Sequence, residues 1–460
     1  MTQHAMEETF ILNDFSEPML GWAPWDNCTS PAILDFPYTG LPGGLFGVLI
    51  SCLFLVYMYA VLTAVCNFYL LPTLADMWKG MTVTSDVIGA TIMAAAAATP
   101  ELAISLVSTF WIEGEVGAEA IVGSATFNCL IIPGVCAFLT KSHNEKPIDI
   151  WPLTRDALMF CISLACLIFC VHGEYVHWYK PFIMVIVYFA YVIGLLLEKY
   201  LRRKTMMLYY WINEEEEKNS PHISLCSDKH YELRTDCYSS CNEADVEYKS
   251  RLPGKSSIEK ETLLTQLCSL LFWPVTIILY ITIPRKYPSL AIFMSLTWIA
   301  VVSYIATWMI IYIGYNLNIP DSLMALTVLG FGLGIPELLS SICAAKTGKY
   351  TMALCNAFGA NTFNILLCLG LPWSIKLLIS NNQSIWVNTE GLAYNCALIL
   401  VIVTVIYASL ALNEFVLDKK IGCFFLVLYS IFVVLSTLIE MNVFYPVNLP
   451  LCNIKDYYYD

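Results

Sequence analysis

The segment "AAAAATPELAIS", residues 94–105, places five alanines and a proline just before the carboxylate of Glu101. A related segment, "GIPELLSS", returns at residues 334–341. Each copy is followed by a second shared motif, "GSATFNCLIIPG" at 123–134 and "GANTFNILLCLG" at 359–370. One shift of 236 residues superimposes both pairs without a gap, and Glu and Asn are 27 residues apart in each copy. The chain therefore contains an internal repeat centred on a glutamate and an asparagine.

The repeat lies within long apolar segments. Of the 460 residues, 58% are hydrophobic and 13% are charged, which is typical of a multi-span membrane protein. Because a span needs about 20 apolar residues, we expect ten core transmembrane helices, near 45–68, 84–110, 116–139, 153–172, 178–200, 289–313, 321–345, 350–373, 390–412 and 421–441. A shorter apolar segment, 266–283, contains Pro274 and is expected to be interfacial or re-entrant.

Charge sets the expected orientation. Residues 1–43 hold six acidic residues and no Lys or Arg, whereas the run "EKYLRRK" at 198–204 is basic. Basic loops favour the cytoplasmic side, which predicts an extracellular segment 1–43, a first transmembrane repeat 44–200, a cytoplasmic loop 201–288, a second repeat 289–441 and a tail 442–460. The glycosylation patterns "NCT" at 27–29 and "NQS" at 382–384 then lie outside the cell.

In this orientation the two copies cross the membrane in opposite directions. The predicted fold is therefore an all-α polytopic membrane protein with two inverted five-helix repeats, an arrangement that recurs in secondary transporters with a site at the repeat interface. The net charge of −13, with no extended basic surface, gives no reason to expect a nucleic-acid partner; the partner of the spans is the lipid bilayer.

Glu101 and Glu337 occupy equivalent positions in the repeats. An ionised carboxylate at the bilayer centre costs several kcal/mol, so such groups face a cavity or a partner. Two facing carboxylates would repel, which favours a shared proton or a cation between them. With the amide oxygens of Asn128 and Asn364 they form a set of hard ligands suited to Ca²⁺, although each amide alone could instead be an interhelical hydrogen bond.

Backbone and hydroxyl oxygens extend the candidate site. A proline disturbs its helix and frees the carbonyl four residues earlier, which for Pro100 and Pro336 predicts Ala96 and Gly332 as carbonyl ligands. Hydroxyls one helical turn from the central residues complete the expected metal-ligand set: Ser105, Ser341 and Ser124. Serines in such positions more often bond to their own helix.

These motifs resemble the sodium/calcium exchanger superfamily, and most of all its potassium-dependent sodium/calcium exchangers. The resemblance rests on "TPEL", "GEVGAEAIVGSATFN", "IPDSLMALTVLGFGLGIPELLSS", "KTGKYTMALCNAFGANTFN" and "LGLPW". It implies an antiporter that exchanges Ca²⁺ for Na⁺, with K⁺ co-transported in the most similar group. It also implies a central site built by Glu101, Glu337, Asn128 and the position of Asn364.

The sequence departs from the family pattern at hydroxyl and acidic positions. Ala97 and Ala98 stand where hydroxyl residues usually precede the first "PE", and Leu333 and Gly334 replace a usual Thr-Ser. Asn364 replaces an aspartate that the family ties to K⁺ coupling. We therefore expect weakened Na⁺ binding or an altered stoichiometry, and a Ca²⁺ flux that does not strictly require K⁺.

Two alternatives stay open at this point. With few hydroxyls for Na⁺, the two glutamates could carry protons in a Ca²⁺/H⁺ exchanger, or the chain could be a transport-inactive scaffold or regulator. An enzyme is not expected, because the repeats hold no zinc-ligand set and no catalytic pair, and no resident cofactor is predicted. The expected location is the plasma membrane or an organelle membrane.

Overall fold

The computed structural model describes eleven stretches of the chain: residues 32–36, 44–78, 94–112, 114–139, 150–173, 175–213, 263–284, 286–346, 350–380, 384–386 and 390–444. Both glycosylation asparagines, Asn27 and Asn382, lie outside these residues, as do most of the segment 1–43, the loop 214–262 and the tail from 445.

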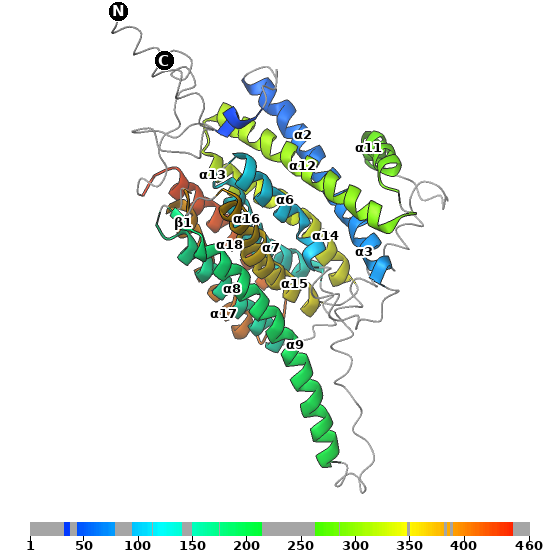
Figure 1. Cartoon of the computed structure of the whole chain (residues 1–460), viewed down its shortest axis with the longest axis vertical. Helices are drawn as coiled ribbons and strands as arrows, with labels where there is room; N and C mark the ends of the chain where they lie inside the picture. The colour runs from blue at the N-terminus through cyan, green and yellow to red at the C-terminus, as the bar shows by residue number, and fades with distance from the viewer. Residues whose placement is uncertain are drawn as a thin grey trace, which may run out of the picture.

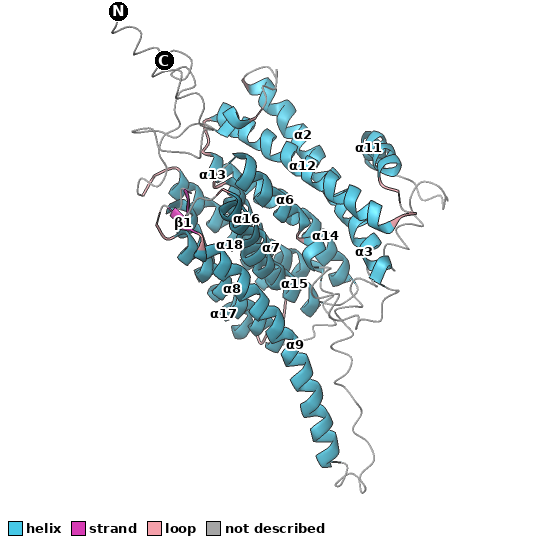
Figure 2. Cartoon of the chain, in the orientation of Figure 1, coloured by secondary structure: helices cyan, strands magenta, loops and turns pink. Residues whose placement is uncertain are grey.

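The described elements are almost all helical (Figure 2). The first half contains η2 (Ala32–Asp35), α2 (Leu45–Val65), η3 (Cys66–Leu70), α3 (Leu71–Trp78), α5 (Ala94–Ala97), α6 (Thr99–Val107), η5 (Ser108–Ile112), α7 (Val116–Leu139), α8 (Ile150–Val171), β1 (Tyr175–His177) and α9 (Tyr179–Asn213). The second half contains α11 (Leu263–Thr282), α12 (Pro288–Leu317), α13 (Asp321–Met324), η7 (Ala325–Leu329), α14 (Gly330–Lys346), α15 (Tyr350–Phe363), η8 (Asn364–Leu369), α16 (Gly370–Ile379), β2 (Ser384–Trp386), α17 (Glu390–Leu412) and α18 (Lys419–Glu440).

Hydrophobic length explains most of these elements. Among the described residues, eight helical stretches are long and apolar enough to cross a membrane: Leu45–Leu74, Val116–Leu139, Ile150–Val171, Pro288–Leu317, Asp321–Ile342, Ala357–Ile379, Gly391–Leu412 and Lys419–Glu440. They agree with eight of the ten expected spans. The other two expected spans correspond to α5–α6–η5, whose start lies outside the described residues, and to α9, whose apolar part is Tyr179–Leu195. The fold is thus the predicted all-α polytopic one, and the count of ten stays a prediction.

Outward-facing side chains of the bundle are apolar. Leu45, Leu49 and Leu53 follow one face of α2 at four-residue spacing and are 73%, 55% and 75% exposed. Such a stripe is unfavourable in water and suits the hydrocarbon core of a bilayer. The polar residues of α7 show the opposite pattern, since Ser124, Thr126 and Asn128 are fully buried. The chain is an integral membrane protein with its polar residues turned inward.

The two repeats run in opposite directions. α7 begins next to the end of α16, where Lys376 Nζ donates a hydrogen bond to the carbonyl of Thr109, just before α7. α7 therefore starts at the end of the bundle where its repeat partner, α15–η8–α16, finishes. At the same end β1 and β2 pair antiparallel, with Val176 opposite Ile385, and join the connections that follow α8 and α16.

α2 and α12 lie side by side in front of the other helices (Figure 1). α12 begins with Pro288, whose missing N–H is not needed in a first turn. It ends at Asn318, which adopts the left-handed conformation with φ 53°. Behind this pair, α7 contacts α14, α15 and α18 and forms the centre of the bundle.

Two helices differ in length or direction from simple spans. α9 continues from the membrane part to Asn213, so the basic run at 198–204 lies on a helix that projects beyond the bundle (Figure 1). α11 is seen nearly end-on where α2 and α12 are seen lengthwise, so it crosses their direction. The interfacial or re-entrant position expected for 266–283 stays a prediction.

Candidate functional site

The alanine-rich segment does not form one continuous helix. It is interrupted at Ala98, whose φ of −87° and ψ of 10° separate α5 from α6. Pro100 then lies in the first turn of α6, where a proline needs no hydrogen-bond partner. Glu101 follows in the same turn, so its carboxylate lies at the positive end of the helix dipole. Local sequence thus fixes a carboxylate at a helix start inside the bundle.

The Ala96 carbonyl has a partner that the repeat argument did not include. Thr99 Oγ1 donates to this oxygen at 2.7 Å and also lies 3.3 Å from the carbonyl of Ala95. The threonine hydroxyl therefore replaces the backbone N–H that Pro100 lacks. Whether Ala96 also contacts an ion stays a prediction.

The carboxylate of Glu101 is buried among groups from both repeats. Its side chain is 0% exposed, and Oε1 lies 3.4 Å from Ser124 Oγ of α7 and 3.5 Å from Asn364 Nδ2 of η8. Asn364 opens a π-helical segment, a local widening of the helix that often occurs at functional positions. The predicted residues Ser124 and Asn364 therefore lie at the glutamate.

Glu337 lies in the equivalent place on α14, one residue after Pro336. Asn128 of α7 donates from Nδ2 to Glu337 Oε2, and the same nitrogen lies 3.1 Å from Asn361 Oδ1. Ser124 and Asn128, one helical turn apart on α7, contact Glu101 and Glu337 respectively, so the two carboxylates lie against neighbouring turns of the same helix. The structure thus brings together Glu101, Glu337, Asn128, Asn364 and Ser124.

Asn361 was missed by the repeat comparison. Its Nδ2 donates to the carbonyl of Ala125 at 3.1 Å, and its Oδ1 accepts from Asn128. Asn361 therefore orients the side-chain amide of Asn128, which donates to Glu337. The shift of 236 residues places Asn361 on Ala125, which has no polar side chain to match. The sequence feature that could have indicated Asn361 is a polar amide side chain within an apolar span, three residues before Asn364 and without a counterpart in the first repeat.

Several buried oxygens at this site have no hydrogen-bond partner within the described part of the chain. They are Glu101 Oε2, Glu337 Oε1 and Asn128 Oδ1. The hydroxyl oxygens of Ser105 and Ser341, each four residues after a glutamate, also lack a partner there, and their role as ligands stays a prediction. A buried polar atom without a partner costs roughly 1–3 kcal/mol, and more if charged. These oxygens are hard donors that fit Ca²⁺ or Na⁺ as a transported substrate.

Gly332 is placed by packing against α2. A Cβ at this glycine would lie 2.1 Å from the ring of Tyr59, so only glycine allows the tyrosine to approach α14 so closely. Tyr59 Oη donates to the carbonyl of Val328 at 2.9 Å. The predicted role of Gly332 as a carbonyl ligand stays a prediction.

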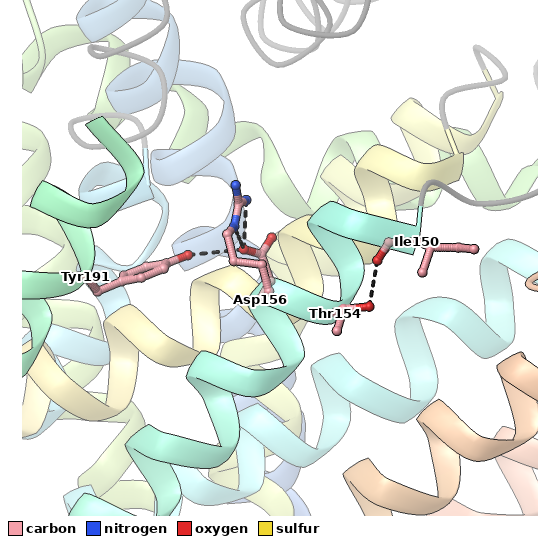
Figure 3. Close-up of polar contacts among 5 residues, drawn as sticks. Ile150, Thr154, Asp156 and Tyr191 are labelled. Carbon is pink, nitrogen blue, oxygen red and sulfur yellow. Dashed lines mark hydrogen bonds and ion pairs between the residues drawn. The ribbon is translucent and has the colours of Figure 1, made fainter. Parts of the chain in front are cut away.

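A carboxylate with a fixed counter-ion shows the contrast. Asp156 of α8 is fully buried, and its Oδ1 lies 2.9 Å from Arg155 and accepts from the hydroxyl of Tyr191 at 3.2 Å (Figure 3). α6 carries no Lys or Arg, and α14 carries only Lys346 at its far end. Among the described residues, no cluster of three or more His, Cys, Asp or Glu side chains forms a resident metal site. The helices that carry Glu101 and Glu337 thus place no basic side chain beside this pair.

The chain matches the family described as "Sodium/calcium exchanger protein" over residues 51–197 and 287–438. It is 27% identical to human sodium/potassium/calcium exchanger 4, with 99% of this chain and 92% of the relative covered. It is 29% identical to human sodium/potassium/calcium exchanger 5, with 88% of each covered. Its fold is similar to the crystal structure of the H⁺/Ca²⁺ exchanger CAX, with a TM-score of 0.50 and 11% identity over 96% of this chain and 90% of that one. The two matched ranges contain both repeats, and the chain belongs to the sodium/calcium exchanger family of multi-pass membrane proteins.

Proposed function

We propose that the chain is a secondary active antiporter that exchanges Ca²⁺ for Na⁺ at the Glu101–Glu337 site. Relatives named as sodium/potassium/calcium exchangers over nearly the whole chain support this reaction class. The inverted repeats supply the structural basis for alternating access, in which one group of helices moves against the other around a fixed site.

The observation that carries the proposal is a crossed pair of contacts between the repeats. Glu101 of the first repeat is bonded by Asn364 of the second, and Glu337 of the second is bonded by Asn128 of the first. Each carboxylate is thus oriented by the opposite half of the molecule. A movement between the halves would change both ends of the site together.

Charge explains how the two ions compete. One Ca²⁺ neutralises two carboxylates, and Na⁺ ions bound at the same oxygens do the same. The unpartnered oxygens of Glu101, Glu337 and Asn128 provide the ligands for either ion. Occupancy by one ion therefore excludes the other, which is the requirement for exchange.

Ion flux in proteoliposomes tests the proposal, with Na⁺, K⁺ and pH varied independently. We expect Na⁺-driven Ca²⁺ uptake in the wild type and a loss of at least about a hundredfold in Glu101→Gln, since removing one partner of a buried charged site costs roughly 3–5 kcal/mol. Glu414→Gln makes the same chemical change in the connection between α17 and α18 and should retain the flux.

Three results would contradict the proposal. Na⁺-driven Ca²⁺ flux that persists in Glu101→Gln would remove this carboxylate from the ion path. Ca²⁺ flux driven by a pH jump in the absence of Na⁺ would replace Na⁺ with H⁺ as the exchanged ion. Wild-type protein that binds Ca²⁺ but moves none under any gradient would indicate a transport-inactive relative.

A further inference from the structure

A second pair of buried glutamates lies away from the central site. Glu119 is in the first turn of α7, and Glu440 is the last residue of α18. Both are at most 1% exposed. Asn395 of α17 and Ser322 of α13 lie against them, and these four side chains form what we name the second acidic cluster: Glu119, Ser322, Asn395 and Glu440.

The amide of Asn395 lies between the two carboxylates. Its Nδ2 donates to Glu440 Oε1 at 2.8 Å and lies 3.4 Å from Glu119 Oε2. Ser322 Oγ donates to the other oxygen of Glu440 at 2.6 Å. Each oxygen of Glu440 thus accepts a hydrogen bond from a neutral side chain of another element.

An oxygen within the cluster lacks a partner. Asn395 is fully buried, and its Oδ1 accepts no hydrogen bond within the described part of the chain. The amide that carries this oxygen is the one that bridges the two carboxylates. Rotation of the amide by half a turn exchanges its oxygen and nitrogen, and would then place a third acceptor oxygen beside two carboxylates. Three acceptors in one place require a cation or a proton.

The helices that build the cluster supply no basic side chain near it. α7, α13 and α17 contain no Lys, Arg or His, and α18 carries only Lys419 and Lys420, at its opposite end. These lysines are 20 residues or more from Glu440, which is roughly 30 Å along a helix. The repulsion between Glu119 and Glu440 is therefore not offset by a charge on their own helices.

The backbone is shaped to admit the carboxylate. A Cβ at Gly391 of α17 would lie 2.6 Å from Glu440 Oε1, so the absence of a side chain there lets the carboxylate reach Asn395. The cluster thus combines two acids, a bridging amide and a hydroxyl from four separate elements, all of them buried.

We propose that the second acidic cluster binds a divalent cation, with Ca²⁺ the best match to its hard oxygen donors. Two carboxylates neutralise one divalent ion, and the amide and hydroxyl oxygens complete the donor set. The site is distinct from the central one, because Glu119 precedes Asn128 by nine residues on α7, or roughly 13.5 Å along the helix. It lies toward the end of the bundle where α7 begins, since Glu119 is in the first turn of that helix.

Equilibrium binding of radiolabelled Ca²⁺ to the purified full-length protein tests this site in a background without the central one. We expect Glu101→Gln/Glu337→Gln to retain one saturable Ca²⁺ per chain, and the added change Glu119→Gln to remove it. Glu414→Gln in place of Glu119→Gln is the matched control and should leave that ion bound. A double variant that binds no Ca²⁺ overturns the proposal, as does a bound ion that survives Glu119→Gln.

A second arm keeps the central site intact. Asn395→Asp adds a carboxylate to the cluster and should tighten the binding of one of the two ions by roughly tenfold, because affinity rises with the number of charged ligands. Unchanged or weaker binding in this variant would show that the amide only bridges the glutamates and holds no ion. If the wild type shows no Na⁺-driven Ca²⁺ flux, the proposed exchange is refuted, whereas the result of this binding experiment is unaffected.

Discussion

Asn364 sets the charge of the central site. Its Nδ2 lies 3.5 Å from Glu101 Oε1. This is the position where the resemblance noted in the sequence implies an aspartate. An amide there leaves the site with the two charges of Glu101 and Glu337, and with a donor to one of them. A third carboxylate would call for a further cation, which is the physical reason to link this position to K⁺.

The variant Asn364→Asp tests that link. We expect wild-type Ca²⁺ flux to change less than about twofold when K⁺ is removed, and Asn364→Asp to acquire a K⁺ dependence of about tenfold, the equivalent of 1.4 kcal/mol. Flux in proteoliposomes with K⁺ replaced by choline measures both. Asn364→Leu, which removes the amide without adding charge, is the control and should gain no K⁺ dependence. Strict K⁺ dependence of the wild type would contradict the argument.

The sequence alone identified those site residues that belong to a motif present in both repeats. Glu101 and Glu337 were found because one offset aligns their motifs, and the structure brings their side chains together. Asn361 was missed because it has no counterpart in the first repeat. The partner of the Ala96 carbonyl was missed because a threonine hydroxyl can replace a helix N–H only in a geometry that the fold provides.

Helices α7 and α14 approach each other through their backbones. A Cβ at Gly123 would lie 1.9 Å from the carbonyl oxygen of Leu326, and one at Gly330 would lie 2.8 Å from Cα of Gly123. Small residues permit such close packing of membrane helices. The contact brings Asn128 within reach of Glu337, so the site depends on these glycines as much as on its ligands.

Gly123→Ala should therefore be strongly destabilising. Its Cβ would displace backbone rather than a mobile side chain, and overpacking of this kind costs at least about 1–3 kcal/mol. Thermal unfolding in detergent measures the effect as a lower midpoint. Gly194→Ala is the matched control, because a Cβ there meets nothing within 4 Å. A similar midpoint for both variants would show that α7 and α14 can move apart at this contact without loss of stability.

Hydropathy located the spans but not their irregular parts. The π-helical segments η3, η5, η7 and η8, the interruption at Ala98 and the extension of α9 to Asn213 were not anticipated. The length of an apolar segment indicates how far a helix can extend across the membrane. A π-helical or interrupted turn depends instead on contacts with neighbouring helices. Val328 in η7 illustrates this, since its carbonyl is bonded by Tyr59 from α2.

At the scale of the whole molecule, the α2–α12 pair forms one group of helices and the other helices form a second. One buried apolar cluster packs this pair against α6 and η7 of the second group, and another lies among α7, α8, α15, α17 and α18. The pair α2–α12 touches the central helices at few polar points, and one of them is the hydrogen bond from Tyr59 to Val328. If α2–α12 slides during exchange, this bond has to break.

Tyr59→Phe tests the sliding step. This hydrogen bond stabilises one end state and is broken in the transition state, so its removal should raise the maximal exchange rate by up to about fivefold, because such a bond contributes about 1 kcal/mol. The apparent Ca²⁺ affinity should stay within about twofold. Tyr407→Phe is the matched control, because its hydroxyl lies 2.7 Å from Thr154 Oγ1 between α8 and α17, within one group. Initial rates of Na⁺-driven Ca²⁺ uptake at several Ca²⁺ concentrations separate rate from affinity. Equal rates in Tyr59→Phe and the wild type, or the same increase in both variants, would mean that α2–α12 does not move past η7.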